Sequence, residues 1–277
     1  MNAIQTLENS AVVPFRFESF GVKIRIDSNL KDMITEAEAV SRRALLGNVV
    51  ETAEGGDFDH HFRLEKTDDL FTLIQNEERI ASDHLRPRFF KFFDSILRVA
   101  VGEYAIDRVF IHAGVVGWKG KAILIPGDSF TGKTTLVAEL VRSGAVYYSD
   151  EFAILDADGL VYPFARPLGM RKDDRTHTPY ELTAEDLHGT FGTEPIQVGM
   201  VLLTSYAADE VWCPKMLSAG EGVLQMIPFT LSIRHRPKFT MEVLNNIAGR
   251  AIITSGRRGT VEIFAKTLLN FVDNHLN

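Results

Sequence analysis

The sequence lacks several features that would assign it to a protein class at once. Cys213 is the only cysteine in 277 residues, so an intramolecular disulfide is excluded and a cysteine-based zinc site is not expected. No apolar run approaches the roughly 18 residues that span a membrane, and residues 1–10 lack the charged and apolar segments of a secretory signal. We therefore expect a cytoplasmic protein with no membrane partner.

An excess of positive charge is also missing. The formal net charge is -7 at pH 7, which gives no electrostatic basis for nucleic-acid binding. Neither an internal repeat nor a low-complexity tract occurs. The chain does have 45% hydrophobic residues, which is ordinary globular composition and enough for a sizeable core.

The first part of the chain, residues 1–105, has the pattern of a small α+β unit. Alternating apolar residues predict strands, and longer stretches with apolar residues three and four apart predict helices. The expected strands are 12–17, 21–26, 61–65 and 70–75, and the expected helices are 30–46 and 82–104.

The second part, residues 106–277, alternates between strand and helix patterns. This alternation predicts an α/β layer architecture. The expected strands are 108–113, 121–125, 145–148, 152–155, 160–163, 198–204 and 251–254, and the expected helices are 133–143, 239–249 and 259–275. Residues 115–125 are expected to form a hairpin that leads into a glycine-containing loop.

That loop matches the pattern G-x-x-x-x-G-K-[ST] of a phosphate-binding (Walker A) loop. Glycines let the backbone turn its N–H groups inward, and the following helix adds its positive end. The lysine can reach the β- and γ-phosphates, and the hydroxyl after it can bind Mg²⁺. The expected nucleotide-binding residues are Gly127, Asp128, Ser129, Phe130, Thr131, Gly132, Lys133, Thr134 and Thr135. We predict that the ligand is ATP with Mg²⁺.

Two acids follow the next predicted strand. Asp150 and Glu151 come one helix and one strand after the loop, where a carboxylate can hold the metal together with Thr134. A carboxylate there can also accept the proton of an attacking hydroxyl. Upstream, His112 ends an apolar strand; taken alone it is read as a core residue with a satisfied hydrogen bond.

The run from His112 to Glu151 resembles the catalytic domain of HPr kinase/phosphorylase. Lys133 lies 21 residues after His112 (133 − 112), and Asp150 lies 17 residues after Lys133 (150 − 133), as in that family. The resemblance implies that Asp150 is the base toward an acceptor serine, that Glu151 is a metal or histidine partner, and that His112 contacts the acids. It covers roughly residues 106–255 and also implies a sheet related to phosphoenolpyruvate carboxykinase, which is an analogy of fold alone.

Departures from the family limit what the resemblance implies. The family has Ser-Glu where this chain has Thr134-Thr135, so one acid is missing. Its later Glu-x-Arg-Gly segment is only weakly matched after residue 162, and Phe164 or a neighbour stands where the glutamate is expected. We therefore expect kinase activity without phosphorylase activity. The related enzymes form rings, which leaves a homo-oligomer open.

Four arginines are candidates for holding the acceptor or the transferred phosphate, with surface charge as the alternative. They are Arg166, Arg171, Arg234 and Arg236. The predicted protein is thus an α/β P-loop kinase of the HPr kinase type, acting on a hydroxyl, with serine of a protein or peptide as the expected acceptor. A nucleotide-binding regulatory protein and a small-molecule kinase remain the alternatives. The N-terminal part could recognise the acceptor or pack against the catalytic part.

Overall fold

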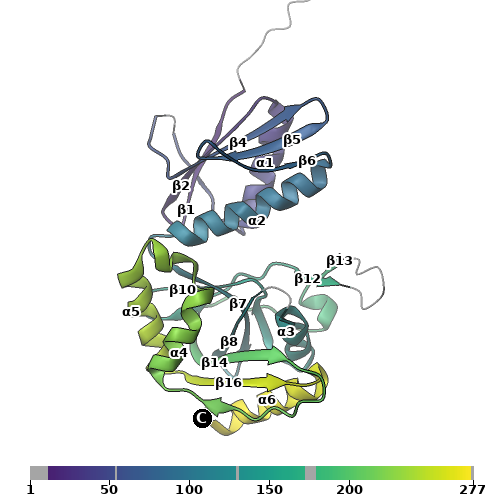
Figure 1. Cartoon of the computed structure of the whole chain (residues 1–277), viewed down its shortest axis with the longest axis vertical. Helices are drawn as coiled ribbons and strands as arrows, with labels where there is room; N and C mark the ends of the chain where they lie inside the picture. Colours follow the sequence, from purple (N-terminus) through teal and green to yellow (C-terminus); the bar gives the residue numbers. More distant parts are fainter. Residues whose placement is uncertain (1–11, 54, 129–130, 172–178, 276–277) are drawn as a thin grey trace, which may run out of the picture. The chain divides into compact units, whose positions relative to one another are not determined.

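The computed structural model describes residues 12–53, 55–128, 131–171 and 179–275, with the backbone alone at 171 and 179. The chain divides into two compact units, Met1–Val101 and Gly102–Asn277. Both units combine sheet and helix, so the prediction of a mixed α/β protein is confirmed (Figure 1).

The first unit contains a six-stranded sheet in the order β3-β1-β2-β4-β5-β6. In β1, β2, β4 and β5 alternate positions hold buried side chains, most of them apolar, and these form one buried face. Phe17, Ile24 and Phe62 are fully buried on this face. The strands are β1 (Phe15–Ser19), β2 (Val22–Ser28), β3 (Val50–Glu51), β4 (His60–Thr67), β5 (Leu70–Gln75) and β6 (Glu78–Asp83).

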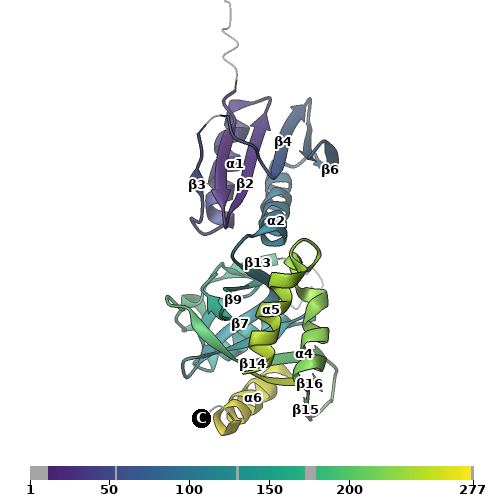
Figure 2. The same ribbon diagram turned by 90° about the vertical axis from the view of Figure 1, so that its left-hand side faces the viewer.

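Two helices, α1 (Lys31–Ala44) and α2 (Arg86–Tyr104), cover the buried face of this sheet (Figure 2). Buried phenylalanines of α2 pack on the sheet, and the ring of Phe93 meets the ring of Phe62 edge-on, with centroids 5.7 Å apart. The start of α2 is tied to α1, because Arg86 forms ion pairs of 2.6 Å with Asp32 and with Glu36.

The second unit is built on an eight-stranded mixed sheet. Its main path is β11-β10-β7-β8-β14-β16-β15, and β9 pairs with β7 beside it. Strands β8, β14 and β16 are parallel, whereas β7 is antiparallel to β8. The bounds are β7 (Val109–Trp118), β8 (Lys121–Pro126), β9 (Val146–Ser149), β10 (Phe152–Leu155), β11 (Leu160–Tyr162), β14 (Ile196–Tyr206), β15 (Lys215–Met216) and β16 (Ile252–Arg258).

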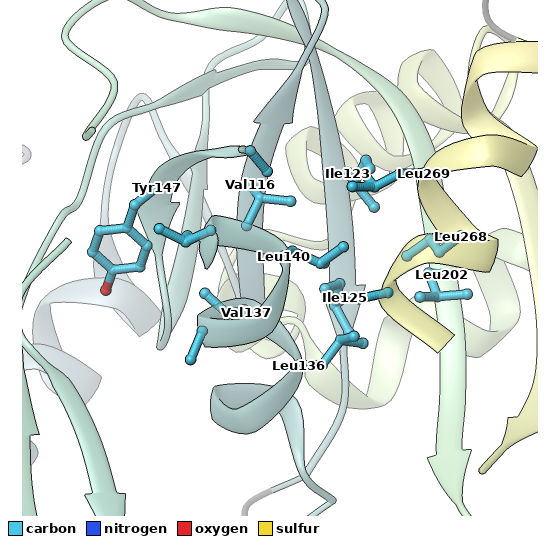
Figure 3. Close-up of a cluster of buried hydrophobic side chains, with 14 of the residues drawn as sticks. Val116, Ile123, Ile125, Leu136, Val137, Leu140, Tyr147, Leu202, Leu268 and Leu269 are labelled. Atoms are coloured by element: carbon cyan, nitrogen blue, oxygen red, sulfur yellow. The ribbon is translucent and has the colours of Figure 1, made fainter. Parts of the chain in front are cut away.

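Helices cover both faces of this sheet. On one face lie α3 (Lys133–Arg142) and α6 (Val261–His275), and on the other lie α4 (Ala219–Met226) and α5 (Pro237–Ala248). Because both faces are buried, β8 is a continuous apolar run instead of an alternating one. Figure 3 shows the first of these cores, in which side chains of α3 meet those of β8 and α6: Leu136, Val137, Leu140, Ile123, Ile125, Leu268 and Leu269.

Several predicted elements are corrected. Residues 82 and 83 belong to strand β6 and not to the helix, which begins at Arg86 after Asp83 has accepted a 2.8 Å hydrogen bond from the amide of Leu85. The hairpin β12 (Leu168–Arg171) with β13 (Pro179–Leu182) and helix α4 were not predicted. A signal for α4 is present in the sequence, since Ser218 and Glu221 form a capping box.

Candidate functional site

The glycine-containing loop lies between β8 and α3, at the carboxyl end of a parallel strand, where α/β sheets commonly bind ligands. Gly132 precedes the helix with a φ of +80°, a left-handed conformation that favours glycine. The first residue of the loop is hydrogen-bonded to β7, since the amide of Gly127 donates a 3.3 Å bond to the carbonyl of His112. Ser129 and Phe130 lie outside the described residues.

Lys133 points back into the loop from the first turn of α3. Its Nζ donates to the carbonyl oxygens of Gly127, at 2.7 Å, and Asp128, at 2.6 Å. The residue is only 8% exposed. Burial lowers the pKa of Lys133, and the charges of Asp150, Asp128 and Glu151 oppose that decrease. The loop therefore holds a buried ammonium group against neutral carbonyls, which phosphate oxygens can replace as stronger, charged partners.

The predicted acid pair lies in the turn between β9 and β10. The hydroxyl of the buried Ser149 shapes this turn, since it accepts hydrogen bonds from the amides of Glu151, at 3.2 Å, and Phe152, at 3.1 Å. The carbonyl of Glu151 in turn accepts a 3.1 Å bond from Ala113 of β7. The acid turn and the first residue of the phosphate loop are therefore both hydrogen-bonded to β7.

Asp150 is the most strongly perturbed acid of the site. Burial raises the pKa of its carboxyl to about 7, and the like charge of Glu151 adds to the increase. A hydrogen bond from Thr134 and the charge of Lys133 lower it, so these groups lie close enough to interact. Among the described residues, Oδ1 of Asp150 is buried and has no hydrogen-bond partner. Such an acid can take up a proton near neutral pH or bind a cation.

His112 lies on β7 directly opposite Phe152 of β10, with the two ring centroids 6.0 Å apart. Burial lowers the pKa of His112, and the charge of Lys133 lowers it further, whereas Glu151 and Asp128 act in the opposite direction. These electrostatic interactions place the imidazole among the loop lysine and the acids. The neutral ring is therefore the favoured form in the ligand-free site.

The four predicted arginines are placed differently. Arg166 is half-buried near the acids, because its carbonyl accepts a 2.6 Å bond from the hydroxyl of Tyr147, whose pKa responds to Asp150 and Glu151. The side chain of Arg171 lies outside the described residues, and Arg234 is exposed. Arg236 donates to the carbonyls of Ala105 and Ile106 after α2. The guanidinium group of Arg236 is therefore bonded to the backbone of the segment that precedes β7.

Arg258, at the end of β16, is a residue that the sequence analysis missed. Its Nη2 donates a 2.9 Å hydrogen bond to the carbonyl of Gly132, and the residue is only 3% exposed. Burial lowers the pKa of this guanidinium group. Among the described residues its Nε has no hydrogen-bond partner. No local pattern marks Arg258 in the sequence, since it lies in a short segment between a predicted strand and a predicted helix.

The side chains that could hold a metal are few. Across the described part of the chain, no group of three or more His, Cys, Asp and Glu side chains forms a metal-binding cluster. Thr134 and Asp150 are hydrogen-bonded, and Mg²⁺ is commonly bound through one or two carboxylates, with water and substrate phosphates completing its shell. The orphaned Oδ1 of Asp150 and the Thr134 hydroxyl fit that mode of binding.

Replacing Ser149 with alanine is expected to destabilise the protein by about 1–3 kcal/mol, because two amides of the acid turn lose their acceptor. Urea unfolding monitored by circular dichroism measures this loss. Thr193→Ala, at an exposed position, is the control and should change stability by less than about 0.5 kcal/mol. Equal stability of the two variants would show that the hydroxyl does not hold the turn.

Comparison with known proteins gives a partial similarity. No family model matches the chain. The HPr kinase/phosphorylase of Mycoplasmopsis pulmonis is 33% identical over 88 residues, which cover 30% of this chain and 28% of that protein. The matched region therefore spans less than a third of the relative. This similarity supports a distant relationship and suggests a kinase-like function. Among the described residues, no helix is long and apolar enough to cross a bilayer.

Proposed function

We propose that the chain is an ATP-dependent phosphotransferase of the HPr kinase type that phosphorylates a hydroxyl group, with a serine of a protein or peptide as the acceptor. The observation that carries the proposal is the convergence of Lys133, Thr134 and Asp150 at the mouth of the loop. Lys133 is the cation for the phosphates, Thr134 the metal-binding hydroxyl, and Asp150 the base. The distant similarity to HPr kinase/phosphorylase supports a kinase-like activity.

The reaction assigned to this site is an in-line transfer. The acceptor O–H gives its proton to the Asp150 carboxylate while its oxygen forms a bond to the γ-phosphorus. The bond from that phosphorus to the bridging oxygen breaks, leaving a phosphoester and ADP. In the ligand-free site the pKa of Asp150 is about 7, so burial already makes this carboxylate a stronger base than an ordinary aspartate. Lys133 compensates the charge on the oxygens of the transferred group.

The remaining site residues support these steps. Mg²⁺, held by Thr134, Asp150 and Glu151, would neutralise phosphate charge when bound. Backbone amides between Gly127 and Thr135 would bind the phosphates. His112, which is near Glu151 and Lys133, adjusts the charge of the acid pair. Arg166 is the arginine best placed for the acceptor, because its backbone is bonded to Tyr147 next to the acid turn.

We also propose that phosphorylase activity is absent. Phe164 or a neighbour stands where the family's later glutamate is expected, and the side chain of Phe164 is buried at 1% exposure. A buried aromatic ring supplies no carboxylate to the reverse reaction. Thr135, at the position of the other missing acid, is exposed and also carries no charge.

Labelled ATP tests the proposal directly. The full chain is incubated with γ-labelled ATP, Mg²⁺ and either a serine-containing peptide library or a metabolite mixture, and products are identified by mass spectrometry. We expect ADP and a phosphoester on the acceptor, and we expect EDTA to abolish the transfer. Retention of full transfer in EDTA would contradict the metal role. A phosphorylated metabolite without a phosphopeptide would favour a small-molecule kinase.

A nucleotide-binding regulatory protein is the second candidate. The observation in its favour is Thr135, an uncharged residue where the related kinases have an acid. Its expected signature in the same experiment is tight ATP binding with no transfer to any hydroxyl acceptor.

A further inference from the structure

A small cavity lies next to Arg258, on the face of the sheet that carries α3 and α6. Its volume is about 290 Å³, at the lower limit of cavities that hold small molecules. Two segments form it, one after β14 and the other at the start of α6. Its lining includes Asp209, Glu210, Trp212, Thr260, Ile263 and Phe264.

Two aromatic rings line the cavity, and contacts of their own fix them in place. The rings of Trp212 and Phe264 meet edge-on, with centroids 5.2 Å apart, and Phe271 supports Trp212 from 5.3 Å. The segment after β14 is tied to the end of β16, because Ala207 donates a 2.9 Å bond to the carbonyl of Arg258. Such a preformed apolar cavity with polar groups at its edge is typical of a ligand site.

Arg258 connects this cavity to the phosphate loop. One end of its guanidinium bonds to the carbonyl of Gly132, at 2.9 Å, directly before the helix that would bind the phosphates. The same guanidinium carbon lies 5.8 Å from the ring centroid of Phe264, which lines the cavity. A single buried side chain therefore extends from the end of the loop to the cavity wall.

The strand order indicates the direction in which a nucleotide extends from the loop. Asp150 follows β9, which pairs with β7 on one side of β8, so the reacting γ-phosphate belongs on that side. The remainder of the nucleotide is then expected on the opposite side, over β14 and β16. Since the proposed phosphate site lies at the start of α3, we expect the base on the face covered by α3 and α6. The cavity lined by Trp212 and Phe264 lies on this side of β8 and on this face of the sheet.

We propose that this cavity binds the purine base of the nucleoside triphosphate, an inference that rests on the proposed phosphotransferase function. The rings of Trp212 and Phe264 supply the aromatic contact for the planar base. Asp209 and Glu210 line the same cavity and supply acceptors for the N–H groups at the edge of a purine. Arg258 lies between the base and the phosphates. Its contacts with Gly132 and with the ring of Phe264 hold the cavity in a fixed position relative to the loop.

A second cavity makes the assignment testable. It measures about 560 Å³, is lined by the loop residues Gly127, Asp128 and Thr131, and has Leu224 of α4 on its far wall. Helix α4 covers the opposite face of the sheet from α3. The proposal therefore expects a bulky residue in the α6 cavity to obstruct the base, and the same residue in the α4 cavity to leave it unaffected.

The experiment compares ATP with inorganic tripolyphosphate, which carries the phosphates without a base. Dissociation constants are measured by calorimetry with Mg²⁺ for wild type, for Thr267→Trp in the α6 cavity, and for Leu224→Trp in the α4 cavity; both positions are exposed. Ile263→Trp, at another exposed position of the α6 cavity, is the second variant in case Thr267→Trp does not fold.

In wild type we expect ATP to bind roughly 5- to 100-fold more tightly than tripolyphosphate, as base stacking on aromatic side chains suggests. Thr267→Trp should remove this advantage and leave tripolyphosphate binding unchanged, while Leu224→Trp should alter neither. Equal affinities of wild type for the two ligands, or a loss of ATP affinity in Leu224→Trp alone, would overturn the base site and leave the phosphate site standing. No binding of either ligand would overturn both proposals.

The cavity also contains its own reporter. Trp212 is one of two tryptophans in the chain, the other being Trp118. In a Trp118→Phe background we expect ATP to change the emission of Trp212, and tripolyphosphate to leave it unchanged. An identical response to the two ligands would contradict contact between the base and Trp212.

Discussion

Replacing Asp150 with asparagine is expected to lower phosphoryl transfer by about 10²- to 10⁴-fold, the contribution of a positioned general base. Asparagine keeps the size of the side chain and its hydrogen bond with Thr134, but it cannot accept the proton of the acceptor hydroxyl. Steady-state transfer from γ-labelled ATP measures the loss. Asp158→Asn, at an exposed position of the following turn, should leave the rate unchanged. Undiminished transfer by Asp150→Asn would remove Asp150 as the base.

The same substitution is expected to stabilise the ligand-free protein in a pH-dependent manner. The pKa of Asp150 rises from 3.8 to about 7 on folding, so the folded state favours the neutral carboxyl. The stability that this group contributes is complete below its unfolded pKa and is lost as the pH rises through the folded value. The asparagine side chain is neutral at every pH, so the advantage of Asp150→Asn over the wild type should grow between the unfolded and folded pKa values and then level off.

Urea unfolding in EDTA at pH 5 and pH 8 measures this effect. We expect the advantage of Asp150→Asn at pH 8 to be on the order of 1–3 kcal/mol, less than the full shift would give because the residue is partly exposed. Asp158→Asn is again the control and should show no growth with pH. If the difference in unfolding free energy between wild type and Asp150→Asn stayed constant across this pH range, burial would not be raising the pKa of the Asp150 carboxyl.

The second large effect is expected from Lys133→Met, which should lower transfer by about 10²- to 10³-fold and weaken ATP binding, as the removal of one charge-stabilising group does. Methionine preserves most of the buried stem and removes the ammonium that bonds to Gly127 and Asp128. Loss of this charge also raises the pKa of Asp150 further, because Lys133 is one of the two groups that lower it.

A matched control is available on the strand that leads into the loop. Lys121 lies at the opposite end of β8 from the phosphate loop, where its Nζ donates a 2.6 Å bond to Gln197. Lys121→Met should therefore leave transfer and ATP affinity within about twofold of wild type, as expected for a change far from the reacting groups. Equal losses in the two variants would show that the effect comes from general charge or folding and not from the loop.

The sequence by itself determined the features that depend on neighbours along the chain. The loop is recognised by its glycines and lysine, which have clear local conformational roles. The strand before it and the helix after it are predicted by the spacing of apolar residues along the chain. Helix α3 begins at Lys133 and is followed by Gly144 with a φ of +98°, as the predicted end required. The mixed α/β class followed from the same alternation of strands and helices.

Tertiary structure decided what depends on groups that are distant in sequence. Arg258 lies 126 residues from Gly132, and no local pattern could join them. The raised pKa of Asp150 follows from burial and from its neighbours in space, which the order of residues does not give. Likewise, Trp212 and Phe264 become the walls of one cavity only because β14 and β16 are adjacent. Burial and the pairing of distant strands, which no local pattern encodes, determine how this site is charged and what shape it has.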